Sequence, residues 1–336
     1  MACGKFSGGR GGRVILFGGA DPGGRREGDG RVKAGLGIDA GGTLTKLVAV
    51  SKSGRTLKEA SFPTFVSAGP KDFVARLAAE VRAFERGLGG LSGPAGMAIA
   101  GDVDPKAGRI RRSPNLTSFE GYPLRAAVRR ALRRPVEMHN DANMAAYGAY
   151  ALEFGRRKEH VAVVTLGTGV GGGAVSHGRL IEGGSGSALE LGHTRVENPG
   201  GRRCSCGARG HLEAYAGSYG ILGLYKDLSK KTAHEPKEVA EAARRGERAA
   251  KAVWNQVGEA LAVGVGNLVY LFNPDAVVFT GGVAEAGELY LEPLRAAFAR
   301  ETFRGPFGRV RVSVARRRGL GASGAAAYAL DAARRL

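Results

Sequence analysis

The chain has 336 residues, of which 43% are apolar and 24% charged, enough for one large or two medium globular cores. Its formal net charge of +19 suggests nucleic-acid binding, but the Arg pairs are scattered and no aromatic residues alternate with them. We therefore interpret the charge as a solvated, Arg-rich surface and expect no specific nucleic-acid partner. No apolar run approaches the roughly 20 residues of a membrane helix, so no membrane partner is expected.

The N-terminal region and the cysteines predict a cytoplasmic protein. The apolar run at residues 14–17 is too short for the core of a secretory signal. Three cysteines, Cys3, Cys204 and Cys206, are too few for a disulfide framework in a chain of this length. Residues 1–33 are rich in Gly and Arg and lack periodic apolar positions, which predicts a disordered tail without a DNA-reading helix pair.

Regular patterns begin at residue 36, where three strands precede alternating helices and strands. The first helix is predicted from Phe73, Leu77 and Val81, which share one face. The strands of this half are predicted at 36–39, 47–50, 55–62, 97–100 and 136–139. The later helices of this half are predicted through 124–132 and at 142–154.

The same order of elements restarts in the second half. A strand at 161–166 is followed by a hairpin at 171–181 with His177-Gly178 at its tip. The remaining elements are a helix at 247–272, a strand at 276–280, a helix at 288–300, a strand at 310–314 and a helix from 322. Two βββαβαβα units predict an internal duplication.

This pattern predicts an N-terminal lobe at 34–140 and a C-terminal lobe at 141–320. The helix at 321–336 is expected to pack back on the N-terminal lobe. An insertion at about 182–231 interrupts the second unit, and the unusual residues gather in it.

Two glycine-rich turns occupy matching positions between strands, Asp39-Ala40-Gly41-Gly42-Thr43 and Gly167-Thr168-Gly169. Without a Cβ, such turns let backbone N–H groups converge on an anion, although many are simple hairpins. Their pairing predicts a phosphate site, as does Gly281-Gly282 after the strand at 276–280. Asp39 either holds Mg²⁺ through water beside the phosphates or caps its own turn.

Four segments, taken in order, resemble the ROK family of sugar kinases and repressors. They are Asp39-Ala40-Gly41-Gly42-Thr43, Asn140-Asp141-Ala142-Asn143, Leu166-Gly167-Thr168-Gly169-Val170-Gly171-Gly172 and Cys204-Ser205-Cys206-Gly207-Ala208-Arg209-Gly210-His211-Leu212-Glu213. The resemblance extends from residue 35 nearly to the end, and the last segment is its most specific signature.

The resemblance implies a two-lobed α/β fold of the actin-like ATPase (ribonuclease H-like) type. It also implies ATP-dependent phosphorylation of a hexose hydroxyl, with glucose to glucose 6-phosphate as the first candidate and N-acetylhexosamine or fructose as alternatives. A homodimer is expected by resemblance alone. The sequence leaves open whether polyphosphate can replace ATP.

Phosphoryl transfer to a sugar needs a group that accepts the hydroxyl proton. Asp141 follows a strand and begins a helix, and it matches the catalytic aspartate of the family, although a helix N-cap is the structural alternative. The resemblance further implies sugar-binding residues, of which Asn115 could also be an ordinary turn residue. They are Asn115, Asn140, Glu190, His193 and Glu213.

His193, Cys204, Cys206 and His211 have spacings of eleven, two and five residues. Four N and S ligands suit a structural tetrahedral Zn²⁺, which would fix the positions of Glu190 and Glu213. The alternative is a pair of reduced cysteines near two unrelated histidines. The family more often has a third Cys where this chain has His211. The other histidines, His139, His160, His177 and His234, are interpreted as structural or surface residues.

Two further hypotheses come from other classes. A sugar-sensing transcription regulator is possible in this family, but the N-terminal region lacks DNA-binding helices. The segment Gly42-Thr43-Leu44-Thr45-Lys46 also resembles the start of pantothenate kinases of the same fold, which lack the segment from Cys204 to Glu213.

Overall fold

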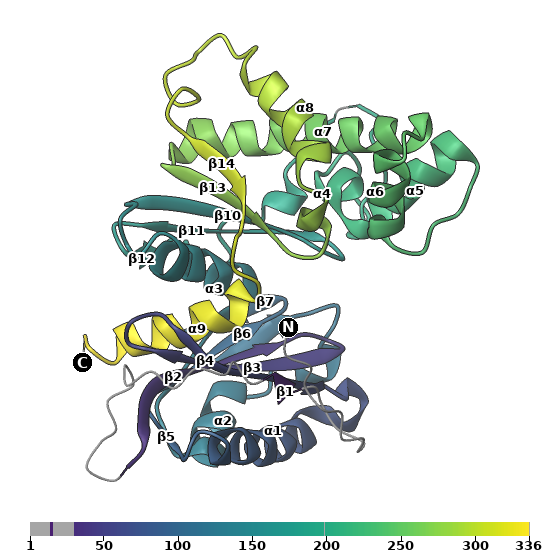
Figure 1. The fold of residues 1–336 in the computed structure, drawn as a ribbon. Coiled ribbons are helices and arrows are strands. Elements are labelled where there is room, and N and C mark those ends of the chain that lie inside the picture. The colour runs from purple at the N-terminus through teal and green to yellow at the C-terminus, as the bar shows by residue number, and fades with distance from the viewer. Residues whose placement is uncertain (1–13, 16–29, 198, 336) are drawn as a thin grey trace, which may run out of the picture. The chain divides into compact units, whose positions relative to one another are not determined.

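The computed structural model describes residues 14–15, 30–197 and 199–335 (Figure 1). The chain divides into two compact units, and each is described here by itself. Unit 1 comprises residues 1–141 with 325–336, and unit 2 comprises residues 142–324. Within the described ranges, no helix has the length and apolar character that crossing a membrane requires.

Unit 1 is built on a mixed sheet with the strand order β1-β4-β3-β2-β6-β9. The pairs β1/β4, β4/β3 and β3/β2 are antiparallel, whereas β2/β6 and β6/β9 are parallel. The short strand β5 pairs with β2. The strands are β1 (Val14–Ile15), β2 (Val32–Ala40), β3 (Leu44–Ser51), β4 (Thr56–Pro63), β5 (Leu91–Ser92), β6 (Ala95–Ile99) and β9 (Val136–Asn140).

Helices α1 (Gly69–Arg86) and α2 (Leu124–Leu132) lie on one side of this sheet, and α9 (Leu320–Ala332) lies on the other (Figure 1). Helix α1 buries Phe73, Leu77 and Val81, the face that its apolar spacing predicts. A Cβ on Gly96 of β6 would come within 2.0 Å of the backbone carbonyl oxygen of Ala325. Glycine therefore lets α9 approach the sheet backbone closely.

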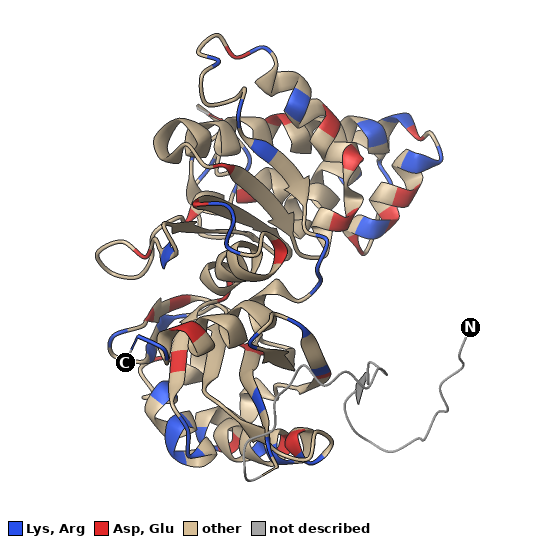
Figure 2. Ribbon diagram, turned by 60° about the vertical axis from the view of Figure 1, so that its left-hand side comes forward, with Lys and Arg blue, Asp and Glu red and all other residues tan. Residues whose placement is uncertain are grey.

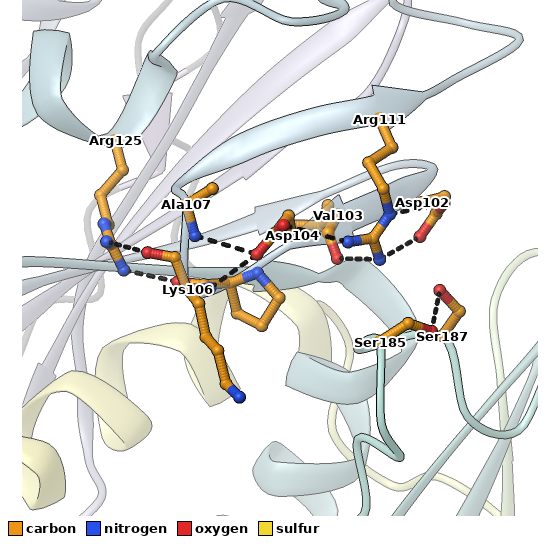
Figure 3. A network of polar contacts seen from close by, with 10 residues as sticks. Asp102, Val103, Asp104, Lys106, Ala107, Arg111, Arg125, Ser185 and Ser187 are labelled. Atoms are coloured by element: carbon orange, nitrogen blue, oxygen red, sulfur yellow. Dashed lines mark hydrogen bonds and ion pairs between the residues drawn. The ribbon is translucent and has the colours of Figure 1, made fainter.

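A hairpin that periodicity did not predict, β7 (Asp102–Asp104) and β8 (Arg109–Arg112), follows β6. Arg111 pairs with Asp102 at 2.8 Å and with Asp104 at 3.3 Å. Arg125 of α2 donates to the carbonyl oxygens of Pro105 and Lys106 at 2.6 and 2.8 Å (Figure 3). These charge pairs act together with the buried side chains of Val103 and Ile110, which belong to the core of unit 1.

Unit 2 contains a second sheet with the order β12-β11-β10-β13-β14. Its first two pairs are antiparallel and its last two are parallel, the same sequence of directions as in β4-β3-β2-β6-β9 of unit 1. The predicted duplication agrees with this order but remains a prediction. The strands are β10 (His160–Leu166), β11 (Val170–Ser176), β12 (Arg179–Leu180), β13 (Ala276–Thr280) and β14 (Arg311–Val314).

The helix predicted at 142–154 is α3 (Asp141–Gly148) followed by a π-helical turn, Ala149–Glu153. Three helices between β12 and α7 were not predicted, although the two longer ones bury apolar residues at helical spacing. The other helices associated with this sheet are α4 (Glu213–Ala216), α5 (Ser218–Ser229), α6 (Pro236–Arg244), α7 (Arg248–Phe272) and α8 (Glu288–Phe298).

One expectation is modified, that of a disordered N-terminal tail. The tail predicted at 1–33 contains β1 and the start of β2, since Val14 and Ile15 pair with Ala60 and Glu59. The rest of that prediction, at 1–13 and 16–29, lies outside the described residues. Lys and Arg are spread over each unit and mixed with Asp and Glu, as the scattered Arg pairs of the sequence suggested (Figure 2).

Candidate active site

The first glycine-rich turn joins β2 to β3 in unit 1. Thr64 fixes its shape, because the Thr64 hydroxyl donates to the carbonyl oxygen of Gly41 at 2.7 Å and its backbone N–H donates to that of Thr43 at 3.0 Å. Thr43 is exposed, and Gly41 and Gly42 are half-buried. A fixed turn with accessible backbone is suited to binding phosphate oxygens.

The turn and the catalytic candidate occupy the same edge of the sheet. β2, β6 and β9 are parallel neighbours, and Ala40, Ile99 and Asn140 are aligned across them. Neighbouring strands are about 4.8 Å apart, so Asn140 lies two strand spacings from Ala40. Asp141 follows directly. These residues therefore meet at the carboxyl ends of parallel strands, where open α/β sheets bind ligands.

Asn115 lies against the first glycine turn. A Cβ on Gly42 would come within 2.9 Å of both the Cβ and the carbonyl oxygen of Asn115, so glycine permits the approach. The buried Ser113 supports this loop: its hydroxyl donates to the carbonyl oxygen of Ala100 at 2.8 Å and accepts from the N–H of Asn115 at 3.3 Å. The structure thus brings a predicted sugar-binding residue to a predicted phosphate turn.

Asn140 ends β9 and Asp141 begins α3. Nδ2 of Asn140 donates to the carbonyl oxygen of Gly101 at 2.9 Å, which orients the amide. Asp141 is half-buried in the first turn of the helix, where the helix dipole favours a negative charge. An accessible carboxylate held in this way is suited to accepting a proton from a substrate hydroxyl.

Asp39 lies within β2, one residue before its end, and is opposite Lys46 of β3. Burial raises the pKa of the Asp39 carboxyl, and the positive charge of Lys46 opposes that shift. A nearby cation would stabilise the ionised form of this desolvated carboxylate. The positive charge of a bound Mg²⁺ would act on Asp39 in the same direction as that of Lys46.

In unit 2 the second glycine turn joins β10 to β11, with Thr168 exposed at its tip. β13 is the parallel neighbour of β10, and Thr280 is aligned with Thr165, so Gly281 follows at the same sheet edge. Gly281 has a φ of +102°, and a Cβ there would lie 2.3 Å from the carbonyl oxygen of Leu166. Only glycine fits this position, and the backbone after it is exposed.

The four predicted zinc ligands lie together in unit 2. One ligand atom from each of His193, Cys204, Cys206 and His211 lies within 4.8 Å of those of the others. Sγ of Cys204 is 3.9 Å from Nδ1 of His193, and Sγ of Cys206 is 3.3 Å from Nδ1 of His211. Ligands of one tetrahedral zinc, with bonds of about 2.0–2.3 Å, lie about 3.4–3.8 Å apart. The side chains present therefore fit a Zn²⁺ ion.

The protonation chemistry of the cluster also suits a metal. Burial, reinforced by the charges of His193 and Arg195, lowers the pKa of His211, which favours the neutral imidazole that binds metals. Burial raises the pKa of the Cys204 thiol. A bound metal would displace that proton, because the thiolate is the ligand.

Glu213 links this cluster to the second glycine turn. Its Oε1 accepts from the hydroxyl of Ser205 at 2.7 Å and from that of Tyr219 at 3.3 Å. Its Oε2 accepts from the backbone N–H of Val170 at 3.1 Å. A Cβ on Gly169 would lie 2.2 Å from the same Oε2. One carboxylate thus connects the cysteine loop with the turn after β10.

Glu190 directly precedes a short 3₁₀ turn, Leu191–His193, and His193 ends it; both residues are exposed. The backbone N–H of His193 donates to the carbonyl oxygen of Glu190 at 3.0 Å, which fixes the spacing of the two residues. Of the sugar-binding candidates, unit 1 carries Asn115 and Asn140, and unit 2 carries Glu190, His193 and Glu213.

Sequence reasoning missed Tyr219 and Ser205. The Tyr219 hydroxyl lies 3.6 Å from Sγ of Cys204 and accepts from the backbone N–H of Ser205 at 3.1 Å. Burial raises the pKa of Tyr219 above its ordinary value, so it remains a hydrogen-bond donor near neutral pH. Ser205 lies inside the quoted cysteine motif and could have been noticed, whereas no sequence signal marks Tyr219.

The fold and sequence of this chain are similar to those of known proteins. The structure of a ROK family glucokinase from Streptomyces griseus in complex with glucose and AMPPNP is similar, with a TM-score of 0.75 and 31% identity over 88% of this chain and 99% of that one. The fold is therefore that of ROK kinases of the actin-like ATPase class. The ROK family model matches residues 35–332, and the chain belongs to the ROK family, which confirms the resemblance.

Individual relatives include both enzymes and repressors. A glucokinase of Thermotoga maritima is 36% identical over 273 residues, which cover 77% of this chain and 85% of that protein. A xylose repressor of Caldicellulosiruptor bescii is 30% identical over 234 residues, which cover 66% of this chain and 58% of the repressor.

Proposed function

We propose that this chain is a hexose kinase that transfers the γ-phosphoryl group of ATP to a sugar hydroxyl, with glucose to glucose 6-phosphate as the first candidate. The observation that carries the proposal is the alignment of the first glycine turn with Asn140 and Asp141 across β2, β6 and β9. The similarity to glucokinases supports the substrate class. N-acetylhexosamine and fructose remain alternative acceptors.

In this proposal Asp141 is the general base that takes the proton of the sugar hydroxyl as the bond to phosphorus forms. Backbone groups of the turns at Gly41-Gly42-Thr43, Gly167-Thr168-Gly169 and Gly281-Gly282 bind the nucleotide phosphates. Asp39 holds Mg²⁺ through water, and the ion neutralises charge on the β- and γ-phosphates when it is bound.

The sugar is bound by side chains that accept and donate hydrogen bonds, as a polyhydroxyl ligand requires. The proposed set is Asn115, Asn140, Glu190, His193 and Glu213. A structural Zn²⁺ on His193, Cys204, Cys206 and His211 fixes the loop that carries Glu213. A cytoplasmic homodimer completes the proposal.

Replacement of Asp141 tests the proposed role directly. Asp141→Asn retains the shape of the side chain but removes its basicity, so ATP-dependent glucose phosphorylation should fall about 10²–10⁴-fold in kcat. Asp72→Asn, an exposed position on α1, is the matched control and should leave kcat unchanged. A near-normal kcat for Asp141→Asn would assign the base to another residue.

The xylose repressor among the relatives motivates a second candidate, a sugar-responsive regulator. A panel of hexoses and acetamido-hexoses should be tested with ATP beside a salt-dependent DNA-binding assay. The kinase proposal expects turnover with at least one sugar. No turnover with any sugar by the zinc-loaded protein, together with specific DNA binding, would replace it with the regulator.

A further inference from the structure

A second group of side chains with metal-ligating atoms lies at the start of β10. It shares no residue with the cysteine cluster. Glu159 directly precedes β10, and His160 is its first residue. His177 directly follows β11, the antiparallel partner of β10. One ligand atom from each of these three residues lies within 4.8 Å of those of the others. Sequence analysis did not connect the three residues, because His177 comes seventeen positions after His160 in the chain.

The backbone that carries the three residues is held by several hydrogen bonds. The N–H of His177 donates to the carbonyl oxygen of Glu159 at 2.9 Å. The N–H groups of Glu159 and His160 both donate to one carboxylate oxygen of Asp275 at 3.0 Å. His177 and Gly178 have left-handed φ values of 48° and 74°, as in a tight hairpin turn. The spacing of the three side chains therefore rests on a fixed frame.

The side-chain geometry is close to that of a metal site. Nδ1 of His177 is 3.6 Å from Oε2 of Glu159. Nitrogen and oxygen ligands of one tetrahedral zinc lie about 3.4 Å apart. The side chains of His177 and Glu159 are 67% and 71% exposed, so they can move the remaining distance without disturbing the core. The ring of His160 is 4.6 Å from that of His177 between centroids.

His160 has a side-chain contact that can orient its ring for metal binding. Its Nδ1 lies 2.9 Å from the hydroxyl oxygen of Ser176, the residue aligned with it on β11. When Nδ1–H donates to that oxygen, the lone pair for a metal is on Nε2, and the ring orientation is fixed. The ring of Phe272 lies 6.2 Å from that of His160 between centroids.

We propose that Glu159, His160 and His177 form a second metal site that binds Zn²⁺ or a similar divalent transition-metal ion. Two imidazoles and one carboxylate give three protein ligands, and water completes the coordination, as in open zinc sites. The site is separate from the proposed Cys₂His₂ site and does not depend on the kinase function. Its simplest competitor is an ion pair between protonated His177 and Glu159.

The test measures zinc bound per chain and its affinity in the full-length protein by titration with Zn²⁺ alone. His177→Asn removes the imidazole but keeps a residue that tolerates left-handed φ. His234→Asn replaces an exposed histidine outside the cluster and is the matched control. We expect His177→Asn to bind one equivalent fewer than the wild type, and His234→Asn to match the wild type.

Two further measurements identify the site. Glu159→Gln should lower the Zn²⁺ affinity of this site. Ser176→Ala should lower that affinity by about 10–100-fold, because the contact that orients His160 is lost. In a Co²⁺ titration, the cobalt ion that the wild type binds and His177→Asn does not should show no thiolate-to-cobalt charge-transfer absorption, because this site contains no cysteine. Equal stoichiometry and affinity in the wild type and His177→Asn would overturn the proposal, as would a thiolate band for the lost equivalent.

Discussion

Replacement of Glu213 probes the connection between the cysteine loop and the second glycine turn. Glu213→Ala removes three hydrogen bonds, from the N–H of Val170 and from the hydroxyls of Ser205 and Tyr219, and a weaker one from the thiol of Cys204. Hydrogen bonds to a charged group contribute about 1.5–3 kcal/mol each, but three that share one carboxylate are not additive. We expect the free energy of unfolding to fall by about 2–4 kcal/mol.

Glu213→Gln separates geometry from charge. The amide oxygen can accept from Val170 while the NH₂ group donates to Ser205 and Tyr219, whose hydroxyls also accept hydrogen bonds. This variant should lose less than about 1 kcal/mol, within the range of a neutral hydrogen bond. If Glu213 also binds the sugar as a carboxylate, both variants should raise the KM for hexose. The KM for ATP should rise only in Glu213→Ala, because that change loosens the turn after β10.

Urea-induced unfolding gives the free energies, and initial rates with each substrate varied give the KM values. The matched pair makes the outcome specific to the hydrogen bonds, because both variants remove the charge. Unfolding free energies and KM values for Glu213→Ala that equal those of the wild type would refute the reasoning.

Three other predictions concern packing, pH and metal. Gly96→Ala should lower the free energy of unfolding in urea by at least about 1–3 kcal/mol, because the new Cβ would lie 2.0 Å from a backbone carbonyl oxygen. Gly305→Ala is the control, since a Cβ there meets open space, and it should leave the free energy of unfolding unchanged. Burial lowers the pKa of Lys58, so the unfolded chain binds more protons between the folded and unfolded pKa values. Stability relative to Lys58→Met should therefore rise as pH increases towards 10.5, and parallel curves would contradict this. His211→Cys should retain zinc through longer dialysis against a chelator than the wild type, and His211→Ala should lose it sooner, as metal analysis would detect.

The sequence by itself determined the local elements. An apolar run bounded by turn residues predicted the strand at 276–280, which the structure reproduces as Ala276–Thr280, and helical spacing predicted α7 to within one residue at each end. The glycine turns and the cysteine motif were visible because short-range chemistry marks them. These features depend on neighbouring residues, so a linear pattern is enough to find them.

Elements held by charge or by tertiary packing were harder to predict. The β7/β8 hairpin combines charge pairs of Arg111 with the buried Val103 and Ile110, and its strands, Asp102–Asp104 and Arg109–Arg112, are too short for a clear alternating pattern. Helix α5, which carries Tyr219, buries an apolar stripe at helical spacing, but Gly220 and Gly223 lower its helix propensity. Propensity is a weak signal in such segments, because contacts with the rest of the unit determine their conformation.

Only the tertiary structure decided which distant residues meet. Strand register aligned Ala40 and Asn140 through Ile99 of β6, and so brought the first glycine turn to the same sheet edge as Asp141. The same kind of pairing brought His177 beside Glu159. Periodicity indicates which face of a strand is buried but not which strand becomes its neighbour, because pairing depends on packing over the whole unit. The sequence therefore determined the chemical groups, and the fold determined which of them come together.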